Sequence, residues 1–111
     1  MSVNPPVDNR VAICVCTYGR GKALSRLLAS MEDIDLTGYN PDAVELIVVD
    51  NRPDPATREL CMKASGRLPL RLHYTEETQP GITYARNRAV AVALERGARF
   101  VAFIDDDDQP R

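Results

Sequence analysis

The sequence contains one histidine, His73, and three cysteines, Cys14, Cys16 and Cys61, with no CxxC spacing among them. This scarcity excludes the usual zinc patterns, which need several cysteines and histidines at short spacings. An odd number of cysteines also argues against a disulfide framework and favours a reduced, cytosolic chain. Cys14 and Cys16 lie two positions apart in an apolar run, where both side chains share one face of a strand. We interpret them as small core residues.

Long apolar runs are absent as well, because no stretch reaches the roughly 18 apolar residues of a membrane span. Residues 1–10 lack the apolar core of a signal peptide. The sequence therefore predicts neither a secretion signal nor a membrane span in this chain, although a longer parent protein could carry a membrane segment downstream. We expect a cytoplasmic location, with the inner face of the membrane as an alternative for the full-length protein.

Neither sign of charge dominates, because 14 lysines and arginines stand against 16 aspartates and glutamates, for a net charge of −2. Such a chain has no overall field to gather nucleic acid or anionic lipid, so we expect no nucleic-acid partner. Any bound anion must be held by a local site. The 111 residues, 44% of them apolar, suit one domain, which we expect at residues 11–111 after a flexible N-terminal segment at residues 1–10.

Apolar patterning predicts four strands that alternate with three helices. The expected strands are Val11–Thr17, Val44–Asp50, Leu70–Thr75 and Arg99–Asp105, the third alternating and therefore near a sheet edge. The expected helices run from Lys22 to about Glu32, from Pro55 to Gly66, and between Thr83 and Gly97. Strands connected in this way run parallel through right-handed crossovers. This predicts an α/β, Rossmann-like sheet of order 3-2-1-4 with flanking helices.

The helix ends carry their own signals. Asp54 before Pro55 is typical of a helix start, because the carboxylate caps free N–H groups and proline sets the first helical φ. Thr83 is placed to cap the third helix, and Gly97 to end it in the left-handed conformation. The third helix is expected to face the sheet with small residues, namely Ala85, Ala89, Val92 and Ala93.

In a sheet of this order the winding reverses between the first and fourth strands, and ligands bind outside the carboxyl ends of the strands at that point. Three of the four predicted strands deliver polar or acidic residues there. These residues are Thr17, Tyr18, Asp50, Asn51, Asp105, Asp106, Asp107 and Asp108.

The acidic run Asp105–Asp108 indicates a divalent cation. Successive carboxylates repel one another, which raises their pKa values or requires a compensating charge. Mg²⁺ or Mn²⁺ takes oxygen ligands and completes its shell with water and phosphate, so one or two of these carboxylates suffice. A solvated acidic loop is the alternative interpretation. The position at the end of a buried strand favours the metal.

Other polar residues near this edge suit a nucleotide. Asp50 can accept a hydrogen bond from a ribose hydroxyl or a base N–H, or else it serves the following loop. Thr17 offers a hydroxyl and Tyr18 an aromatic face, although Tyr18 could equally pack against its own loop. Arg20, Arg86 and Arg88 are candidates for phosphate contacts. We favour Arg86, which we expect in the first turn of the third helix, where the helix dipole also attracts an anion.

Four segments, in this order, resemble the N-terminal part of family 2 glycosyltransferases of the GT-A fold. They cover nearly the whole chain and are VAICVCTYGR from Val11, ELIVVDN from Glu45, GITYARNR from Gly81 and FVAFIDDDDQP from Phe100. The first and last are most similar to bacterial exopolysaccharide glucosyltransferases of the succinoglycan type. This resemblance implies a chain that binds a nucleotide sugar, with UDP-sugars the most frequent donors, and a glycan or lipid-linked glycan acceptor in the full protein.

The resemblance also implies roles for single residues. Thr17 and Tyr18 would contact the donor base, Asp50 the uracil or ribose, and Arg86 the region of the diphosphate. Asp105 and Asp107 would form the DXD motif that binds the donor and its metal. Asp108 would be a neighbouring metal ligand and Asp106 a contact of the nucleotide sugar. Arg20 and Asn51 are further expected contacts of the nucleotide sugar. Asn51 stands where many family members carry a second acid, which keeps a hydrogen-bonding group but loses a charge.

The reaction that the resemblance implies is inverting transfer of a sugar to an acceptor hydroxyl. The family places its general base well after the DXD motif, so we expect that base beyond Arg111 and expect this chain alone to bind donor without turnover. The predicted exposed edge at the fourth strand makes self-association a further expectation.

Two other functions remain open at this point. A receiver-like phosphoacceptor domain has a similar length, but it needs acids after its first strand, where this chain has Thr17. A non-catalytic binding module could keep the fold without the activity, and titration with UDP and Mn²⁺ separates a nucleotide-binding chain from such a module. The lack of a GxGxxG motif after the first strand argues against a dinucleotide dehydrogenase.

Overall fold

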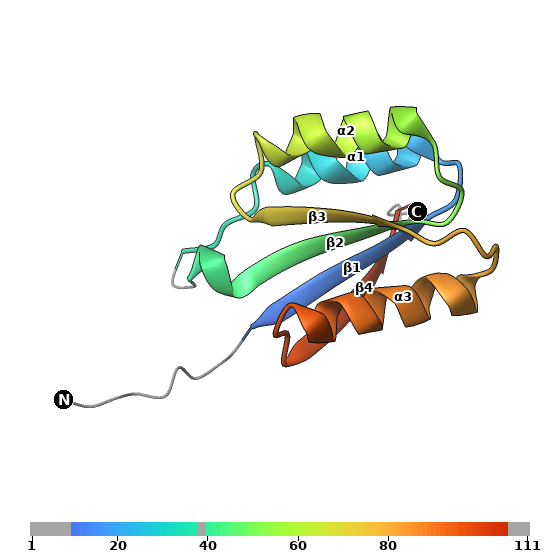
Figure 1. Cartoon of the computed structure of the whole chain (residues 1–111). Helices are drawn as coiled ribbons and strands as arrows, with labels where there is room; N and C mark the ends of the chain where they lie inside the picture. The colour runs from blue at the N-terminus through green and yellow to red at the C-terminus, as the bar shows by residue number, and fades with distance from the viewer. Residues whose placement is uncertain (1–9, 38–39, 107–111) are drawn as a thin grey trace.

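The computed structural model describes residues 10–37 and 40–106 as a parallel four-stranded sheet between two layers of helices (Figure 1). The helices α1 and α2 cover one face, and α3 covers the other. The sheet order is β3-β2-β1-β4, as predicted. The elements are β1 Val11–Thr17, α1 Gly21–Met31, a short 3-10 helix Pro41–Ala43, β2 Val44–Asp50, α2 Pro55–Ser65, β3 Arg71–Glu76, α3 Ile82–Glu95 and β4 Phe100–Asp105.

Strand register brings the predicted polar residues to one edge of the sheet. Thr17, the last residue of β1, pairs with Asp50, the last of β2, and Cys16 pairs with Asp105 of β4. Hydrogen bonding continues past the strands, because the Asn51 amide donates to the Thr17 carbonyl at 2.8 Å. In the same way the Glu77 amide donates to the Asp50 carbonyl at 3.0 Å. The loops after these strands are therefore held in register with the sheet.

The core has two halves, one on each face of the sheet. Successive residues of a strand point to opposite faces, so Leu46 and Val48 of β2 enter one half while Ile47 and Val49 enter the other. The half under α1 and α2 contains large side chains, including Leu24 and Leu28 of α1. The half under α3 is built from small residues, as the sequence predicts: Cys14, Ala85, Ala89, Val92 and Ala93. Small side chains let α3 approach the sheet closely.

The predicted capping residue is confirmed at the start of α2 and is wrong at the start of α3. Oδ1 of Asp54 accepts from the Ala56 amide at 2.9 Å, which is the expected cap. The expectation that Thr83 caps α3 is wrong, because the helix begins at Ile82 and Gly81 precedes it with φ 131° and no side-chain cap. Glycine tolerates this positive φ, so the chain enters the helix earlier than threonine would require. Gly97 has φ 89°, which confirms the predicted left-handed residue after the helix.

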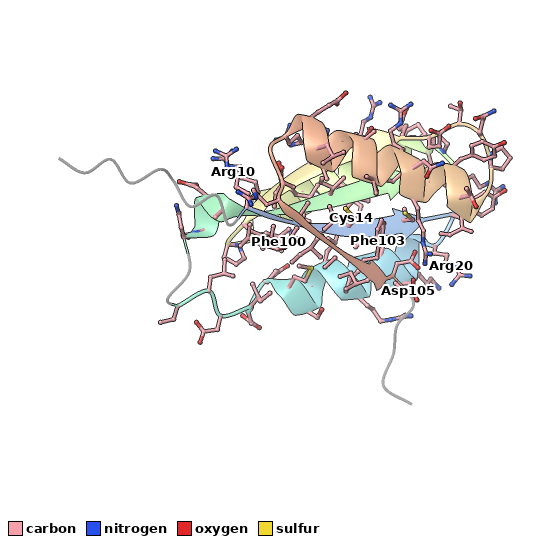
Figure 2. The ribbon with its side chains drawn as sticks, turned by 90° about the horizontal axis from the view of Figure 1, so that it is seen from below. Arg10, Cys14, Arg20, Phe100, Phe103 and Asp105 are labelled. Carbon is pink, nitrogen blue, oxygen red and sulfur yellow. The ribbon has the colours of Figure 1, made fainter. Side chains whose placement is uncertain are left out.

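The two edge strands differ in their apolar content. β3 is half-buried, as its alternation predicts, whereas β4 exposes apolar side chains, notably Phe100 and Phe103, both labelled in Figure 2. No helix within the described ranges is long and apolar enough to cross a membrane. The connection after β1 leads to β2 on one side, whereas β4 lies on the other side of β1. A ligand is expected at the carboxyl edge of the sheet next to this point.

Candidate functional site

A pocket of about 440 Å³ opens at the carboxyl ends of β1 and β2. One wall comes from the turn after β1, and the other from the loop that leads from β3 into α3. Three predicted site residues line it, namely Thr17, Tyr18 and Asn51. The remaining lining residues are Cys16, Pro80, Gly81 and Ile82. The structure thus brings together residues that lie more than sixty positions apart in the sequence.

The hydroxyl of Thr17 is the group in this pocket that most clearly requires a partner. Thr17 is 2% exposed, and its Oγ1 has no hydrogen-bond partner among the described residues. Buried polar atoms are nearly always hydrogen-bonded, because leaving one unsatisfied costs about 1–3 kcal/mol. A polar ligand in the pocket would supply the missing bond.

Tyr18 forms an open aromatic wall of the same pocket. Its side chain is half-exposed, and the guanidinium carbon of Arg52 lies 5.9 Å from the ring centroid in a cation–π contact. A ring that is fixed on one side and accessible on another suits stacking against a planar base.

Asn51 is 6% exposed, and its amide is engaged by the loop that forms the opposite wall. Nδ2 donates to the carbonyl oxygens of Glu77 at 2.9 Å and Gln79 at 2.8 Å. Oδ1 accepts from the Gly81 amide at 3.0 Å. The side chain therefore ties the end of β2 to the residues that precede α3.

Asp50, the last residue of β2 and the neighbour of Asn51 in the chain, has 0% exposure, and its carboxyl group binds the loop after β2. Oδ1 accepts from the Arg52 amide at 3.2 Å, and Oδ2 accepts from the Asp54 amide at 3.2 Å. The hydroxyl of Tyr74 completes the set at 2.7 Å from Oδ2. All of these partners belong to the chain itself, so the Asp50 carboxyl group holds the loop after β2 and joins it to β3.

The acidic end of β4 lies beside the pocket. Burial raises the pKa of the Cys16 thiol to about 11, with Arg86 lowering it and the charges of Asp106 and Asp105 raising it further, so all three charges act on this pocket residue. Asp106 is 6% exposed, and its Oδ2 has no partner among the described residues. Asp107 and Asp108, the other predicted metal ligands, lie outside the described residues. Within the described part of the chain, no three potential ligands are gathered for a metal.

The predicted phosphate-binding arginines are placed differently from one another. Arg86 is the fifth residue of α3, so the expectation that it lies in the first helical turn is wrong by one residue, because the helix begins at Ile82. Its guanidinium carbon lies 5.5 Å from the ring centroid of Phe103. Arg88 forms an ion pair with Glu77 at 3.4 Å. Arg20 precedes α1 and lies at the same end of the sheet as Asp105 (Figure 2).

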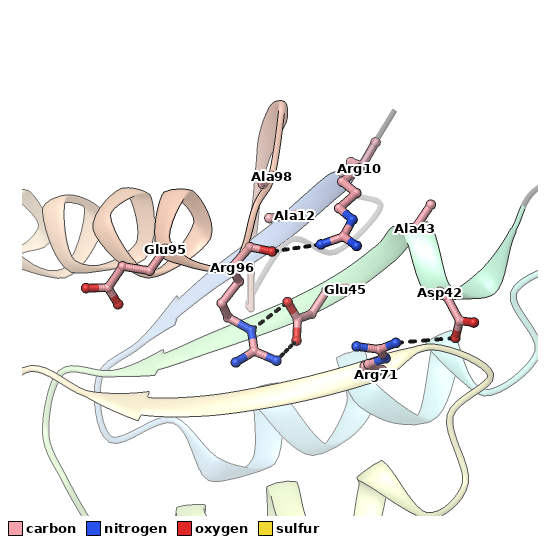
Figure 3. Close-up of a pocket in the computed structure, with 10 residues that line it drawn as sticks. Arg10, Ala12, Asp42, Ala43, Glu45, Arg71, Glu95, Arg96 and Ala98 are labelled. Carbon is pink, nitrogen blue, oxygen red and sulfur yellow. Dashed lines mark hydrogen bonds and ion pairs between the residues drawn. The ribbon is translucent and has the colours of Figure 1, made fainter. Parts of the chain in front are cut away.

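A second pocket of about 270 Å³ lies at the opposite, amino end of the strands (Figure 3). Two ion pairs link charged side chains of this pocket. Arg96 contacts Glu45 through Nε at 2.7 Å and Nη2 at 2.5 Å, and Arg71 contacts Asp42 at 3.5 Å. Arg10 donates to the Arg96 carbonyl at 3.4 Å. These paired charges fasten the end of α3 to β2 and the entry of β1, so we interpret this pocket as structural.

Sequence reasoning missed the roles of Tyr74 and of Pro80–Ile82 in this site. Tyr74 carries no motif, because it lies in an edge strand whose alternation indicates only partial burial. The Pro-Gly pair at positions 80 and 81 signals a turn, but not that the turn forms a wall opposite Tyr18. Both roles depend on contacts between segments that are distant in the sequence.

Comparisons with known proteins identify one family. The model of the family described as glycosyl transferase family 2 matches residues 12–111. Among solved structures, S. aureus TarS 1–349 in complex with UDP is 26% identical with a TM-score of 0.67, covering 88% of this chain and 27% of that one. Mannosyltransferase PcManGT from Pyrobaculum calidifontis, in complex with GDP-Man and Mn²⁺, is 25% identical with a TM-score of 0.68, covering 96% and 30%. The chain thus spans less than a third of these relatives, and no curated protein matched it.

Proposed function

The chain belongs to glycosyl transferase family 2, and we propose that it supplies the part of a glycosyltransferase that binds a nucleoside diphosphate sugar, with UDP as the nucleotide. Its sheet and helices form the amino-terminal part of the GT-A fold. The observation that carries the proposal is the pocket at the carboxyl edge, where the buried Thr17 hydroxyl lacks a partner among the described residues beside the open ring of Tyr18. The two solved relatives bind UDP and GDP-Man, which supports a nucleotide ligand.

In this proposal the base enters between Tyr18 and the Pro80–Ile82 wall. Tyr18 offers its ring for stacking, and Thr17 gives or accepts a hydrogen bond at the base or ribose. Arg20 and Arg86 lie at the end of the sheet where the diphosphate would follow, and an arginine can hold two phosphate oxygens at once. Asp50 contributes indirectly by holding the loop after β2, because its carboxyl group already accepts from three donors of the chain.

The acidic end of β4 fits a divalent cation, Mg²⁺ or Mn²⁺, in two respects. Asp106 has a buried carboxylate oxygen without a partner among the described residues, and Asp105 is exposed next to it. Such cations need only one or two carboxylates when phosphate and water complete the shell. Asp105, Asp107 and Asp108 would hold the ion, with the buried carboxylate oxygen of Asp106 as a further candidate ligand. When bound, the ion neutralises charge on the leaving diphosphate. The Mn²⁺ of the Pyrobaculum relative is consistent with this requirement.

The complete protein, in this proposal, transfers the sugar with inversion to an acceptor hydroxyl of a glycan or lipid-linked glycan, at the cytoplasmic side, in bacterial exopolysaccharide synthesis. Transfer needs a general base within hydrogen-bond reach of the acceptor. We assign no such base among the described residues. The chain alone is therefore expected to bind donor and metal without turnover.

Calorimetric titration with UDP and Mn²⁺ tests the donor site. We expect metal-dependent heat from the unmodified chain, and its loss in the double variant Asp105→Ala plus Asp107→Ala. Asp33→Ala is the control, because this exposed aspartate follows α1 at the opposite end of the sheet. Absence of any UDP binding would reject the proposal. Sugar transfer by the purified chain would instead reject the expectation that it cannot turn over.

A further inference from the structure

We infer that Asn51 is a positioning residue of the nucleotide pocket, which acts by holding the Pro80–Ile82 wall rather than by reading the base. This inference rests on the proposed function, because it concerns how the same pocket recognises its nucleotide. It differs from the expectation that Asn51 contacts the donor directly.

The side-chain amide of Asn51 already has all of its donors engaged by the opposite loop. Both of its N–H bonds point to backbone carbonyl oxygens, of Glu77 at 2.9 Å and Gln79 at 2.8 Å. An amide nitrogen has only these two donors, so none is left for a base acceptor. Its oxygen already accepts from the Gly81 amide at 3.0 Å. With 6% exposure, the side chain presents little surface to the pocket that it borders.

These three bonds fix a wall whose backbone conformation is uncommon. Gly81 has φ 131°, and a Cβ added there would lie 3.4 Å from the Tyr84 ring, so the turn is held in a conformation that few residues adopt. The Gly81 carbonyl accepts from the Ala85 amide at 3.1 Å, which begins α3. Asn51 therefore ties the wall opposite Tyr18, just before α3 begins, to the end of β2.

The substitution Asn51→Asp distinguishes a positioning role from direct reading of the base, because the two roles predict opposite changes of UDP affinity with pH. An ionised carboxylate at position 51 would place an oxygen against the two carbonyl oxygens, which repel it and raise its pKa above the ordinary value of about 3.9. Protonation restores one donor to the loop. A positioning role thus predicts that the affinity of this variant for UDP with Mn²⁺, relative to the unmodified chain, increases as the pH falls from about 8 to about 5.

Direct reading of the base by residue 51 predicts the opposite change of UDP affinity with pH. Uracil and guanine both present N–H donors on their pairing edges, and an ionised carboxylate accepts from them better than a neutral one. In that case the variant would bind UDP as tightly as the unmodified chain or more tightly near pH 8, and more weakly as the pH falls. For the positioning role we expect affinity near pH 8 to be about ten- to a hundredfold weaker, from the loss of two hydrogen bonds and a buried repulsion.

Two further variants complete the experiment. Asn40→Asp makes the same change of charge at the far end of β2, where aspartate can still accept from the Asp42 amide, and it should leave binding unchanged. Asn51→Ala removes all three bonds without adding charge, which keeps the test valid if the aspartate variant does not fold. We expect it to weaken UDP binding at every pH and to increase hydrogen exchange at the Gly81 amide.

The outcomes distinguish this inference from the proposed function. If the unmodified chain binds no nucleotide, the proposed function fails, and the exchange rate of the Gly81 amide still reports on whether Asn51 holds the wall. If the unmodified chain binds UDP and Asn51→Asp binds it with equal affinity at all pH values, the positioning role is rejected while the proposed function stands.

Discussion

The hydroxyl oxygen of Tyr74 lies 2.7 Å from Oδ2 of Asp50 and links the carboxyl ends of β3 and β2. The same oxygen lies 3.0 Å from Oε2 of Glu76, so one phenolic proton faces two carboxyl groups. Arg58 contacts Oε2 of Glu76 at 3.2 Å and its guanidinium lies 5.7 Å from the Tyr74 ring centroid. The contribution of the bond between Tyr74 and Asp50 can be tested directly by substitution.

We predict that Tyr74→Phe lowers the free energy of unfolding at neutral pH by about 1–3 kcal/mol, because buried Oδ2 of Asp50 loses a donor without gaining another. Chemical denaturation followed by circular dichroism measures the change. Tyr84→Phe is the control, since this exposed tyrosine on α3 loses the same hydroxyl from the surface. Equal stability of both variants would contradict a structural role for the Tyr74 bond.

The contribution of Tyr74 should also depend on pH in the alkaline range. Burial, followed by the hydrogen bonds to Asp50 and Glu76, raises the pKa of the phenol in the folded state. The unfolded phenol titrates near its ordinary pKa of about 10, so the stabilisation is complete below that pH and is lost as the pH rises further. We predict that the stability difference between the unmodified chain and Tyr74→Phe shrinks above about pH 10. A difference that stays constant there would contradict a raised pKa.

Thiol labelling should report on the pocket through Cys16. Burial raises the pKa of all three thiols, to about 11 for Cys14 and Cys16 and about 12 for Cys61. Cys16 is only partly buried and lines the pocket, so we predict that it reacts first, with a rate that rises about tenfold per pH unit below its pKa. UDP should slow the reaction. Cys16→Ser identifies the site, and labelling of Cys61 before Cys16 would contradict the structure.

Gly97 and Gly66 each follow a helix, so substitutions at these two positions allow the cost of backbone strain to be compared. Gly97 has φ 89°, and an added Cβ would lie 2.9 Å from Nη1 of Arg10, whereas Gly66 has φ −76° with 3.7 Å to the nearest atom. We predict that Gly97→Ala destabilises the fold by about 1–2 kcal/mol, because left-handed backbone disfavours a Cβ. Gly66→Ala should be neutral or slightly stabilising. Thermal unfolding of the two variants side by side provides the measurement, and equal effects would exclude strain at Gly97.

The exposed edge of β4 predicts concentration-dependent association of the chain. Antiparallel pairing of two β4 strands about Ala102 would set Arg99 of one copy against Asp105 of the other, and each exposed phenylalanine against an aliphatic residue, Phe100 against Ile104 and Phe103 against Val101. We expect Phe100→Lys to weaken this association in sedimentation experiments. Leu94→Lys, which alters an exposed apolar residue of α3, should leave it unchanged. A strict monomer at all concentrations would refute the prediction.

Much of the fold could be predicted from the sequence, because its signals are local. The bounds of β1 and β2 follow from continuous apolar runs, and the start of α2 follows from Asp54 and Pro55. The order of the sheet follows from the right-handed rule for parallel connections, and the comparisons support the family resemblance. The start of α3 was misplaced, since its position depends on the bond between Asn51 and Gly81 rather than on a capping residue.

The candidate site could be predicted only as a set of residues at one edge. Register brings Thr17 and Tyr18 to the pocket as expected, and places Asp105 next to it. Whether a polar side chain faces a ligand or its own chain depends on distant partners, which is why Asp50 and Asn51 could not be distinguished beforehand. The roles of Asp107 and Asp108 remain predictions.

Because the hydrogen bonds of the sheet extend past the strand ends, at Asn51 with Thr17 and at Glu77 with Asp50, the site has no freedom to shift relative to the strands. Deletion of one residue within β2 would exchange the two faces of that strand and draw the Asp50 and Asn51 side chains away from their partners at once. Substitutions within the pocket leave this strand register intact, whereas a residue inserted or deleted within β1 or β2 breaks it.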